Sequence, residues 1–272
     1  MNKPKEKRNA LLWQAFGNWD RIMQQIKRSK QRIAAIERGD SNLDPDYERK
    51  VINDLTPLLE QAKEDMVAYG ENVGPVWDWM TGLRGIGEHT AAKILALYDY
   101  PSYETVSKFW RDGGWAVIDG EIERPTKGEK NHYNARLKSE IYLAGVQFVM
   151  RGTEPYNSIY REEKVRQKEM HPIAVCKECG GVGEKRKQRW YCRECNASGF
   201  KIAFTPKHLD LRARRKMVKI FLEHLWVVWR TTESLPVTEP YAQAILGHSH
   251  YVKPPRVEGV EIPGVDWGPL SE

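Results

Sequence analysis

The sequence predicts a mainly helical protein with a small cysteine-rich insertion. Apolar residues recur at steps of three, four and seven over several long stretches, which is the spacing of an amphipathic helix face. A strand-like pattern is confined to one short segment around residues 115–124, and all four cysteines fall in two Cys-x-x-Cys pairs. We expect five units: a helical hairpin or coiled coil over 1–74, a helix-hairpin-helix domain with a small β-hairpin over 75–170, a cysteine ribbon over 171–203, C-terminal helices including a long basic one over 204–253, and an irregular tail over 254–272.

Composition narrows the class of protein. The chain has 272 residues, 40% of them hydrophobic, so it can bury a core and divide into more than one unit. Lys and Arg number 43 against 37 Asp and Glu, and this net charge of +6 favours a polyanionic partner. No apolar run approaches the roughly 20 residues that cross a bilayer, and charge follows the N-terminal Met1–Lys5 where a signal peptide would be apolar. We therefore expect a cytoplasmic protein without a membrane partner.

Two long helices are expected first. From about Leu11 to Arg38 an apolar stripe runs beside several cations, and residues 39–42 break the pattern. Asp44-Pro45 is a helix start, and a second helix continues to about Tyr69. The two should pair as an antiparallel hairpin, whose outer face offers a surface for self-association or for a protein partner.

The stretch from Leu83 to Leu95 has the pattern of a helix-hairpin-helix element. Gly85 and Gly87 flank one apolar residue, which permits a tight turn, and the amides that open the next helix can meet a phosphate. Such an element holds nucleic-acid phosphates without reading sequence. The expected contact residues are Arg84, Gly85, Ile86, Gly87, His89, Thr90 and Lys93. The alternative is an ordinary two-helix turn in which the glycines serve geometry alone.

The middle of the chain is expected to be mostly helical. Pro101-Ser102 opens a short helix that ends at Gly113-Gly114. Asp119-Gly120 then joins two short strands, since this dipeptide suits the type I′ turn of a β-hairpin. Helices from about 134 to 151 and from about 155 to 169 follow.

The cysteine spacing predicts a metal site. Twelve residues separate the pair Cys176 and Cys179 from the pair Cys192 and Cys195, so two tight knuckles can complete a tetrahedral sulfur site around Zn²⁺. Four thiolates close the coordination sphere, and the zinc should therefore be structural. Two disulfides or a redox pair are the alternatives, and an intracellular chain argues against disulfides.

Cations cluster in and after the ribbon. Between the two knuckles, Lys185, Arg186, Lys187 and Arg189 stand beside Trp190 in a basic, aromatic finger that can lie along a phosphate backbone, the alternative being a solvated loop. Thr205-Pro206 then opens a helix to about Arg230, whose first half is rich in cations. Arg212 and Arg215 of this helix are expected phosphate contacts. The histidines of this region, His208 and His224, are expected at the surface and in the core.

Residues 79–230 resemble the C-terminal domain of insertion-sequence transposases related to the pilin-gene invertase, the RNA-guided recombinases. The resemblance lies in Leu83–Ala91, in Tyr133–Leu137 at the head of a helix, and in the late basic helix Leu211–Arg230. The helical pair before them is similar to that family's coiled coil. The resemblance implies DNA handling of a kind used in recombination or by mobile elements.

Two departures from this family bear on chemistry. The family's RuvC-like domain, which carries metal-binding acids, has no counterpart before the helical pair. Its nucleophilic serine, which precedes a glycine, has no counterpart in Trp115–Gly128, where the sequence contains no serine. The resemblance therefore implies a transposase-like protein without catalytic residues.

The leading expectation is a non-catalytic, largely sequence-independent nucleic-acid-binding protein, with DNA favoured over RNA as partner. The enzyme alternative is a helix-hairpin-helix DNA glycosylase or nuclease, because the hairpin is also similar to that of base-excision glycosylases. That family follows its hairpin with a catalytic aspartate, whereas Ser102–Trp115 of this chain offers only Asp112, beside Gly113 and in a different context. A third alternative is a scaffold that assembles a protein complex and uses zinc only to hold its fold.

Overall fold

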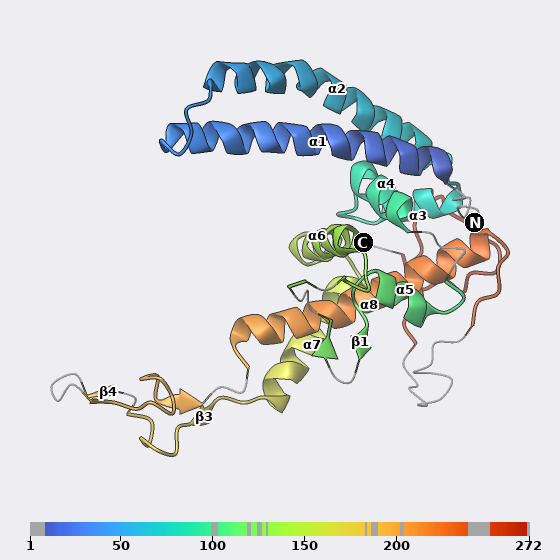
Figure 1. Cartoon of the computed structure of the whole chain (residues 1–272). Coiled ribbons are helices and arrows are strands. Elements are labelled where there is room, and N and C mark those ends of the chain that lie inside the picture. Colours follow the sequence, from blue (N-terminus) through green and yellow to red (C-terminus); the bar gives the residue numbers. More distant parts are fainter. Residues whose placement is uncertain are drawn as a thin grey trace.

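The protein is mainly helical in a computed structural model (Figure 1), as the sequence predicts. The model describes residues 9–98, 103–118, 121–123, 127–128, 130–182, 184–185, 190–201, 204–238 and 251–270. The helices of this part are α1 (Ala10–Glu37), α2 (Pro45–Glu71), α3 (Pro75–Gly82), α4 (Glu88–Leu97), α5 (Val106–Asp112), α6 (Ala135–Arg151), α7 (Tyr156–Met170) and α8 (Pro206–Thr232). The strands are two residues each: β1 (Val117–Ile118), β2 (Glu121–Ile122), β3 (Ala174–Val175), β4 (Glu184–Lys185), β5 (Trp190–Tyr191) and β6 (Phe200–Lys201).

Helices α1 and α2 form the expected antiparallel pair and lie over α4 (Figure 1). The Asp44 side chain caps α2 by accepting a hydrogen bond from the amide of Asp46, and the helix continues through Pro57. The buried stripe of α1 includes Phe16 and Trp19. This stripe attaches the pair to the rest of the molecule.

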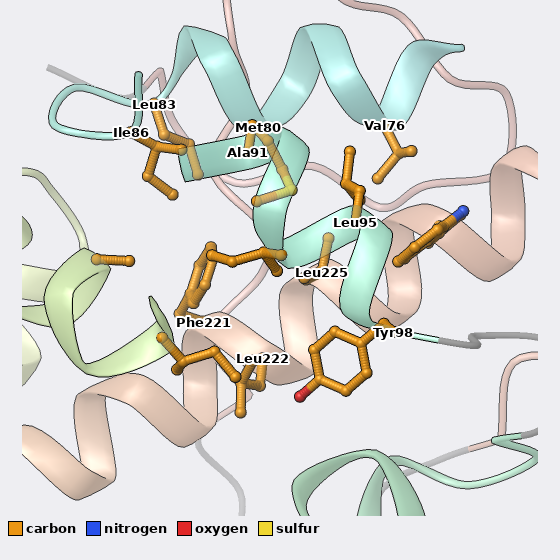
Figure 2. Close-up of a cluster of buried hydrophobic side chains, with 14 of the residues drawn as sticks. Val76, Met80, Leu83, Ile86, Ala91, Leu95, Tyr98, Phe221, Leu222 and Leu225 are labelled. Carbon is orange, nitrogen blue, oxygen red and sulfur yellow. The ribbon is translucent and has the colours of Figure 1, made fainter. Parts of the chain in front are cut away.

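Helices α3 and α4 meet α8 in the centre of the core. Figure 2 shows Met80 of α3 and Leu95 of α4 close to Phe221 and Leu225 of α8. One buried cluster runs from Leu12 of α1 through these helices to residues after α8. The helices on both sides of the expected boundary at 74 and 75 thus share a core, while the division into separate units stays a prediction.

The middle segments follow the expected order. Helix α5 begins at Val106, where the Thr105 hydroxyl accepts from the amide of Lys108, and the predicted start at 101 and 102 lies outside the described residues. Strands β1 and β2 pair in the register Val117↔Ile122 and Ile118↔Glu121. This register is that of a two-residue β-hairpin loop, although residues 119 and 120 themselves are not described. Asn134 caps α6.

The described C-terminal segment, residues 251–270, packs closely against the core. Residues 254–272 were expected to be a tail with few contacts, and this expectation is wrong: Val257, Ile262 and Val265 are buried. The indole Nε1 of Trp79, itself fully buried, donates to the carbonyl of Pro255 at 3.0 Å. The segment is irregular, as expected, because its contacts come from isolated apolar residues between turns and follow no helical or strand period.

No helix within the described ranges combines the length and apolar character needed to cross a membrane.

Candidate metal centre and nucleic-acid interface

The four cysteines meet in one cluster. Their Sγ atoms all lie within 4.8 Å of one another, with Cys176 and Cys192 separated by 3.9 Å and Cys179 and Cys195 by 3.7 Å. A tetrahedral site with metal–sulfur bonds of about 2.3 Å has sulfurs roughly 3.8 Å apart, whereas a disulfide joins sulfurs at about 2.05 Å. The cluster therefore has the dimensions of a metal site, and no disulfide joins its cysteines.

Short strands and left-handed turns bring the two knuckles together. Each Cys-x-x-Cys pair begins directly after a strand, β3 for the first and β5 for the second. Gly181 and Gly199 have φ values of +88° and +78°, and a Cβ on Gly199 would lie 2.3 Å from the carbonyl oxygen of Gly181. Only glycine fits this contact between the knuckles. The amide of Gly199 also donates to the Sγ of Cys195 at 3.2 Å, a second contact that links the end of this turn to the cluster.

The hairpin turn between α3 and α4 requires the freedom of glycine at only one of its two glycines. Gly85 has a φ of +97°, which favours glycine, while Gly87 caps α4 at an ordinary φ of −82°. Arg84 and Gly87 are exposed, Ile86 is buried and Thr90 is half-buried. The turn therefore presents a helix N-terminus to solvent beside one arginine.

Acidic residues and the C-terminal segment surround this turn. A hollow of about 660 Å³ beside Ile86 and Gly87 is lined by the carboxylates Asp78, Glu88 and Glu258. On its wall, a Cβ on Gly82 would lie 2.2 Å from Cγ1 of Val257. Three carboxylates next to the amides repel a phosphate, so this turn is a weaker anion site than its sequence suggests.

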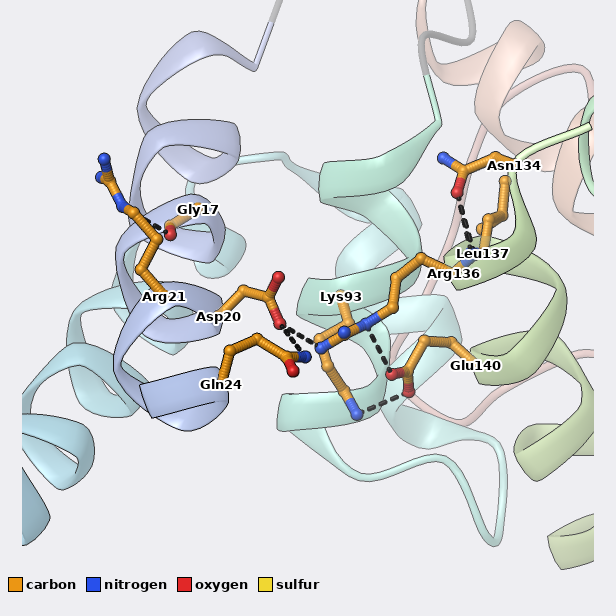
Figure 3. Close-up of polar contacts among 9 residues, drawn as sticks. All are labelled: Gly17, Asp20, Arg21, Gln24, Lys93, Asn134, Arg136, Leu137 and Glu140. Carbon is orange, nitrogen blue, oxygen red and sulfur yellow. Dashed lines mark hydrogen bonds and ion pairs between the residues drawn. The ribbon is translucent and has the colours of Figure 1, made fainter. Parts of the chain in front are cut away.

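Lys93 was expected to contact phosphate, and the structure places it inside the molecule. Its side chain is 10% exposed and its Nζ lies 2.5 Å from Oε2 of Glu140 on α6. Arg136 of α6 binds the same carboxylate and also pairs with Asp20 of α1 (Figure 3). The expectation is corrected because a lysine two turns into α4 meets the carboxylate of a packed neighbouring helix, not solvent.

His89 faces the helical pair. Its ring lies edge-on to the indole of Trp19, with 4.8 Å between ring centroids. Burial, together with the positive charge of Lys93, lowers the pKa of His89 to about 4, so the ring is neutral at pH 7. His89 was expected among the phosphate contacts, but a neutral ring packed on α1 adds no positive charge there.

Part of the basic finger between the knuckles can be placed. Lys185 is exposed, and its Nζ lies 5.9 Å from the centre of the Trp190 ring, a cation–π distance. Arg186, Lys187 and Arg189 lie outside the described residues.

A groove between α7 and α8, which we call the basic groove, gathers cations from both helices. It encloses about 370 Å³ and is closed at one side by Trp110 of α5. Its cations are Arg166 of α7 and Arg212, Arg215, Lys216 and Lys219 of α8. The five cations exceed the two carboxylates of the groove by at least three charges.

The pKa values of those two carboxyl groups are shifted in opposite directions. Burial by itself raises the pKa of Glu163, but hydrogen bonds from Arg166 and Lys216, among others, outweigh it and lower this pKa to about 2. Glu163 therefore holds two of the cations in place. Burial raises the pKa of Glu223 to about 7, so this second carboxyl is only partly charged at neutral pH.

An aromatic residue from another element completes the groove. The Nζ of Lys219 lies 3.9 Å from the centre of the Trp110 ring, and the Trp110 Nε1 donates to the carbonyl of Lys219 at 2.9 Å. The sequence predicts Arg212 and Arg215 as contact residues, but it does not predict Trp110, Arg166, Lys216 or Lys219. The cation-rich first half of α8 gave a signal for Lys219, whereas nothing in the sequence links residue 110 to residue 219.

The histidines are where the sequence indicates. His224 is fully buried; its Nδ1 lies 3.0 Å from the hydroxyl of Tyr156 and its Nε2 lies 2.7 Å from the carbonyl oxygen of Val252. Burial lowers its pKa to about 4. His208 is half-buried and stacks on Phe204.

Comparison with protein-family models, with curated proteins and with solved structures finds no match to this chain.

Proposed function

We propose that the protein binds nucleic acid without catalysing a reaction on it, mainly through phosphates and with little dependence on sequence. The observation that carries this proposal is the basic groove, which is lined by five cations from two helices and by the half-buried Trp110. Phosphates in a groove of this kind gain from several cations at once and release their own counterions. DNA is the first candidate, and RNA shares the chemistry.

Contacts within the protein hold the cations of the basic groove in position to bind a sugar-phosphate backbone. Arg212 donates to the side-chain oxygen of Gln167, and Lys216 to Glu163, so the cations are held in fixed places. Fixed cations bind phosphates without a large loss of side-chain freedom.

The cysteine cluster is best explained as a structural zinc site. Four thiol ligands at tetrahedral spacing favour Zn²⁺ and leave no open position for a substrate. The metal would hold the ribbon at the end of α7 and the start of α8. Protein purified without chelator should contain one zinc per chain by elemental analysis, and a metal-free, folded ribbon would contradict this assignment.

In this proposal the hairpin of α3 and α4 is chiefly a packing element. Arg84 can still contact a phosphate. Lys93 is already paired with Glu140, and carboxylates surround the turn, so we assign the hairpin a structural role and not a binding role. Descent from insertion-sequence transposases is part of the proposal and is supported only by the sequence resemblance. The glycosylase alternative finds little support, because the carboxylate of Asp112 accepts a hydrogen bond from the Tyr103 hydroxyl at 2.7 Å.

The test is the salt dependence of binding. Fluorescence anisotropy should measure affinity for single-stranded, duplex and branched DNA and RNA at several salt concentrations. Replacing Arg215 and Lys219 together by Gln should weaken binding and flatten the slope of log affinity against log salt by about 2 for duplex DNA. The matched control replaces Arg28 and Lys30 by Gln, which removes the same charge from exposed positions of α1.

Equal losses in the two double variants would mean that net charge alone drives binding and would contradict a site in the groove. No binding by the parent protein to any of these probes would reject the nucleic-acid proposal and favour the scaffold alternative. Thermal melting and zinc content of each variant establish that the change did not unfold it.

A further inference from the structure

A second hollow lies where the ribbon joins the helices. It encloses about 720 Å³ between the end of α7 and the start of α8. Its apolar walls include Ile173, Phe204 and Leu209, and its rim carries Lys164, Lys168 and Lys207. A volume in the range of about 300–1,000 Å³ can hold a small molecule or one nucleotide of a strand.

Aromatic rings stand on one side of this hollow. The Phe204 ring lies 4.5 Å from that of His208 in a stacked arrangement and 4.6 Å from that of His171, edge-on. The Arg212 guanidinium, which lines the basic groove, lies 5.1 Å from the centre of the same Phe204 ring. Phe204 thus connects the hollow to the groove.

The charge around the hollow is positive. Its one carboxylate, Asp210, accepts hydrogen bonds from Lys164 and Arg214 at 2.8 and 2.7 Å. Burial by itself raises the pKa of Asp210, but these hydrogen bonds outweigh it and hold the pKa well below its usual range. Lys168 and Lys207 have no carboxylate partner among the described residues, so two cations remain for an anion.

We propose that this hollow receives an unpaired nucleobase, with the neighbouring phosphates held by Lys168 and Lys207. An apolar space beside an aromatic ring accepts the flat face of any base, and cations at its rim match the strand's phosphates. The inference rests on the proposed function and makes it more specific. The preferred ligand is nucleic acid with a single-stranded end or gap, and a blunt duplex can occupy only the groove.

The experiment compares two DNA probes that share one duplex. One is blunt, and the other carries a short 3′ overhang with 2-aminopurine as its first unpaired base. The parent protein should bind the overhang probe more tightly and quench its fluorescence by stacking. Phe204→Leu, which keeps an apolar side chain but removes the aromatic face, should lose about tenfold in affinity for the overhang probe and little for the blunt one.

Two further variants keep the test decisive. Ile173→Glu places a carboxylate at a position that is 63% exposed, so it should remain folded and yet repel the strand from the hollow. Tyr47→Leu, at an exposed tyrosine of α2, is the matched aromatic control and should change neither affinity.

The two proposals fail in different ways. Equal affinity for both probes, or equal losses for both in Phe204→Leu, would overturn the base pocket while leaving phosphate binding in the groove intact. If the parent protein bound neither probe, the proposed nucleic-acid-binding function itself would be rejected. Binding of an acidic, apolar peptide that Ile173→Glu abolishes, with no preference for the overhang, would assign the hollow to a protein partner and overturn the inference.

Discussion

Replacing Lys93 with Met should destabilise the fold and leave nucleic-acid binding unchanged. Removing one partner of a buried ion pair costs about 3–5 kcal/mol, because the remaining charge stays buried. Here the carboxylate of Glu140 keeps a second cation, since Nε of Arg136 lies 3.8 Å from it. We therefore expect the lower end of this range, about 3 kcal/mol.

Urea unfolding followed by tryptophan fluorescence measures this loss. With an m value of about 3 kcal/mol/M, the midpoint should fall by about 1 M while m stays constant. A second probe, such as far-UV circular dichroism, should give the same midpoint. The Lys93→Met/Glu140→Gln double variant should recover most of the loss, because it leaves no unpaired charge and retains an acceptor for Arg136.

A surface pair supplies the control. Lys63 lies 3.3 Å from Glu60, and their side chains are 45% and 59% exposed, so Lys63→Met should cost at most about 1 kcal/mol. If Lys93→Met kept the parent midpoint and weakened nucleic-acid binding as the groove variant does, Lys93 would be a surface phosphate ligand and the reasoning from its burial would be refuted.

Three further predictions concern the glycines and a core histidine. Gly199→Ala should speed the release of metal to a chelator far more than Gly180→Ala. Both glycines have a positive φ, but only a Cβ on Gly199 would meet backbone atoms. Equal release rates in the two variants would contradict this. Gly85→Ala should destabilise by about 1–2 kcal/mol, as expected for a left-handed alanine, whereas Gly87→Ala should be neutral in the same urea assay. Because the pKa of His224 is about 4 in the fold, below its unfolded value of 6.5, stability should fall as pH drops, by about 2 kcal/mol between pH 6.5 and 5. His224→Gln should show a shallower loss, and an unchanged slope would count against this explanation.

The sequence was sufficient for features that depend on neighbouring residues. Asp44 and Thr205 cap helices at starts that the sequence predicts, and the two Cys-x-x-Cys pairs meet as their spacing predicts. Both follow from local chemistry, because a cap or a knuckle is complete within a few residues.

Features that depend on residues far apart in the chain could not be predicted from the sequence. Whether Lys93 faces solvent is decided by Glu140 on another helix, and the basic groove needs Trp110 beside Lys219. The C-terminal segment lacks any periodic pattern, so its burial could not be inferred from a helical or strand repeat. A single sequence shows which residues carry charge but not which of them tertiary packing neutralises.

The ribbon lies within the connection between α7 and α8, so a metal bound there would affect how these two helices are held together. Helix α7 ends at Met170 and α8 begins at Pro206, so the two helices that form the groove are joined by residues 171–205. An unstructured connection of that length costs about 3 kcal/mol in chain entropy to close. A metal that folds the ribbon shortens the free connection and offsets part of this cost. A bound ion would thus act as a tether between α7 and α8, and its removal would weaken the packing of the two helices that form the groove.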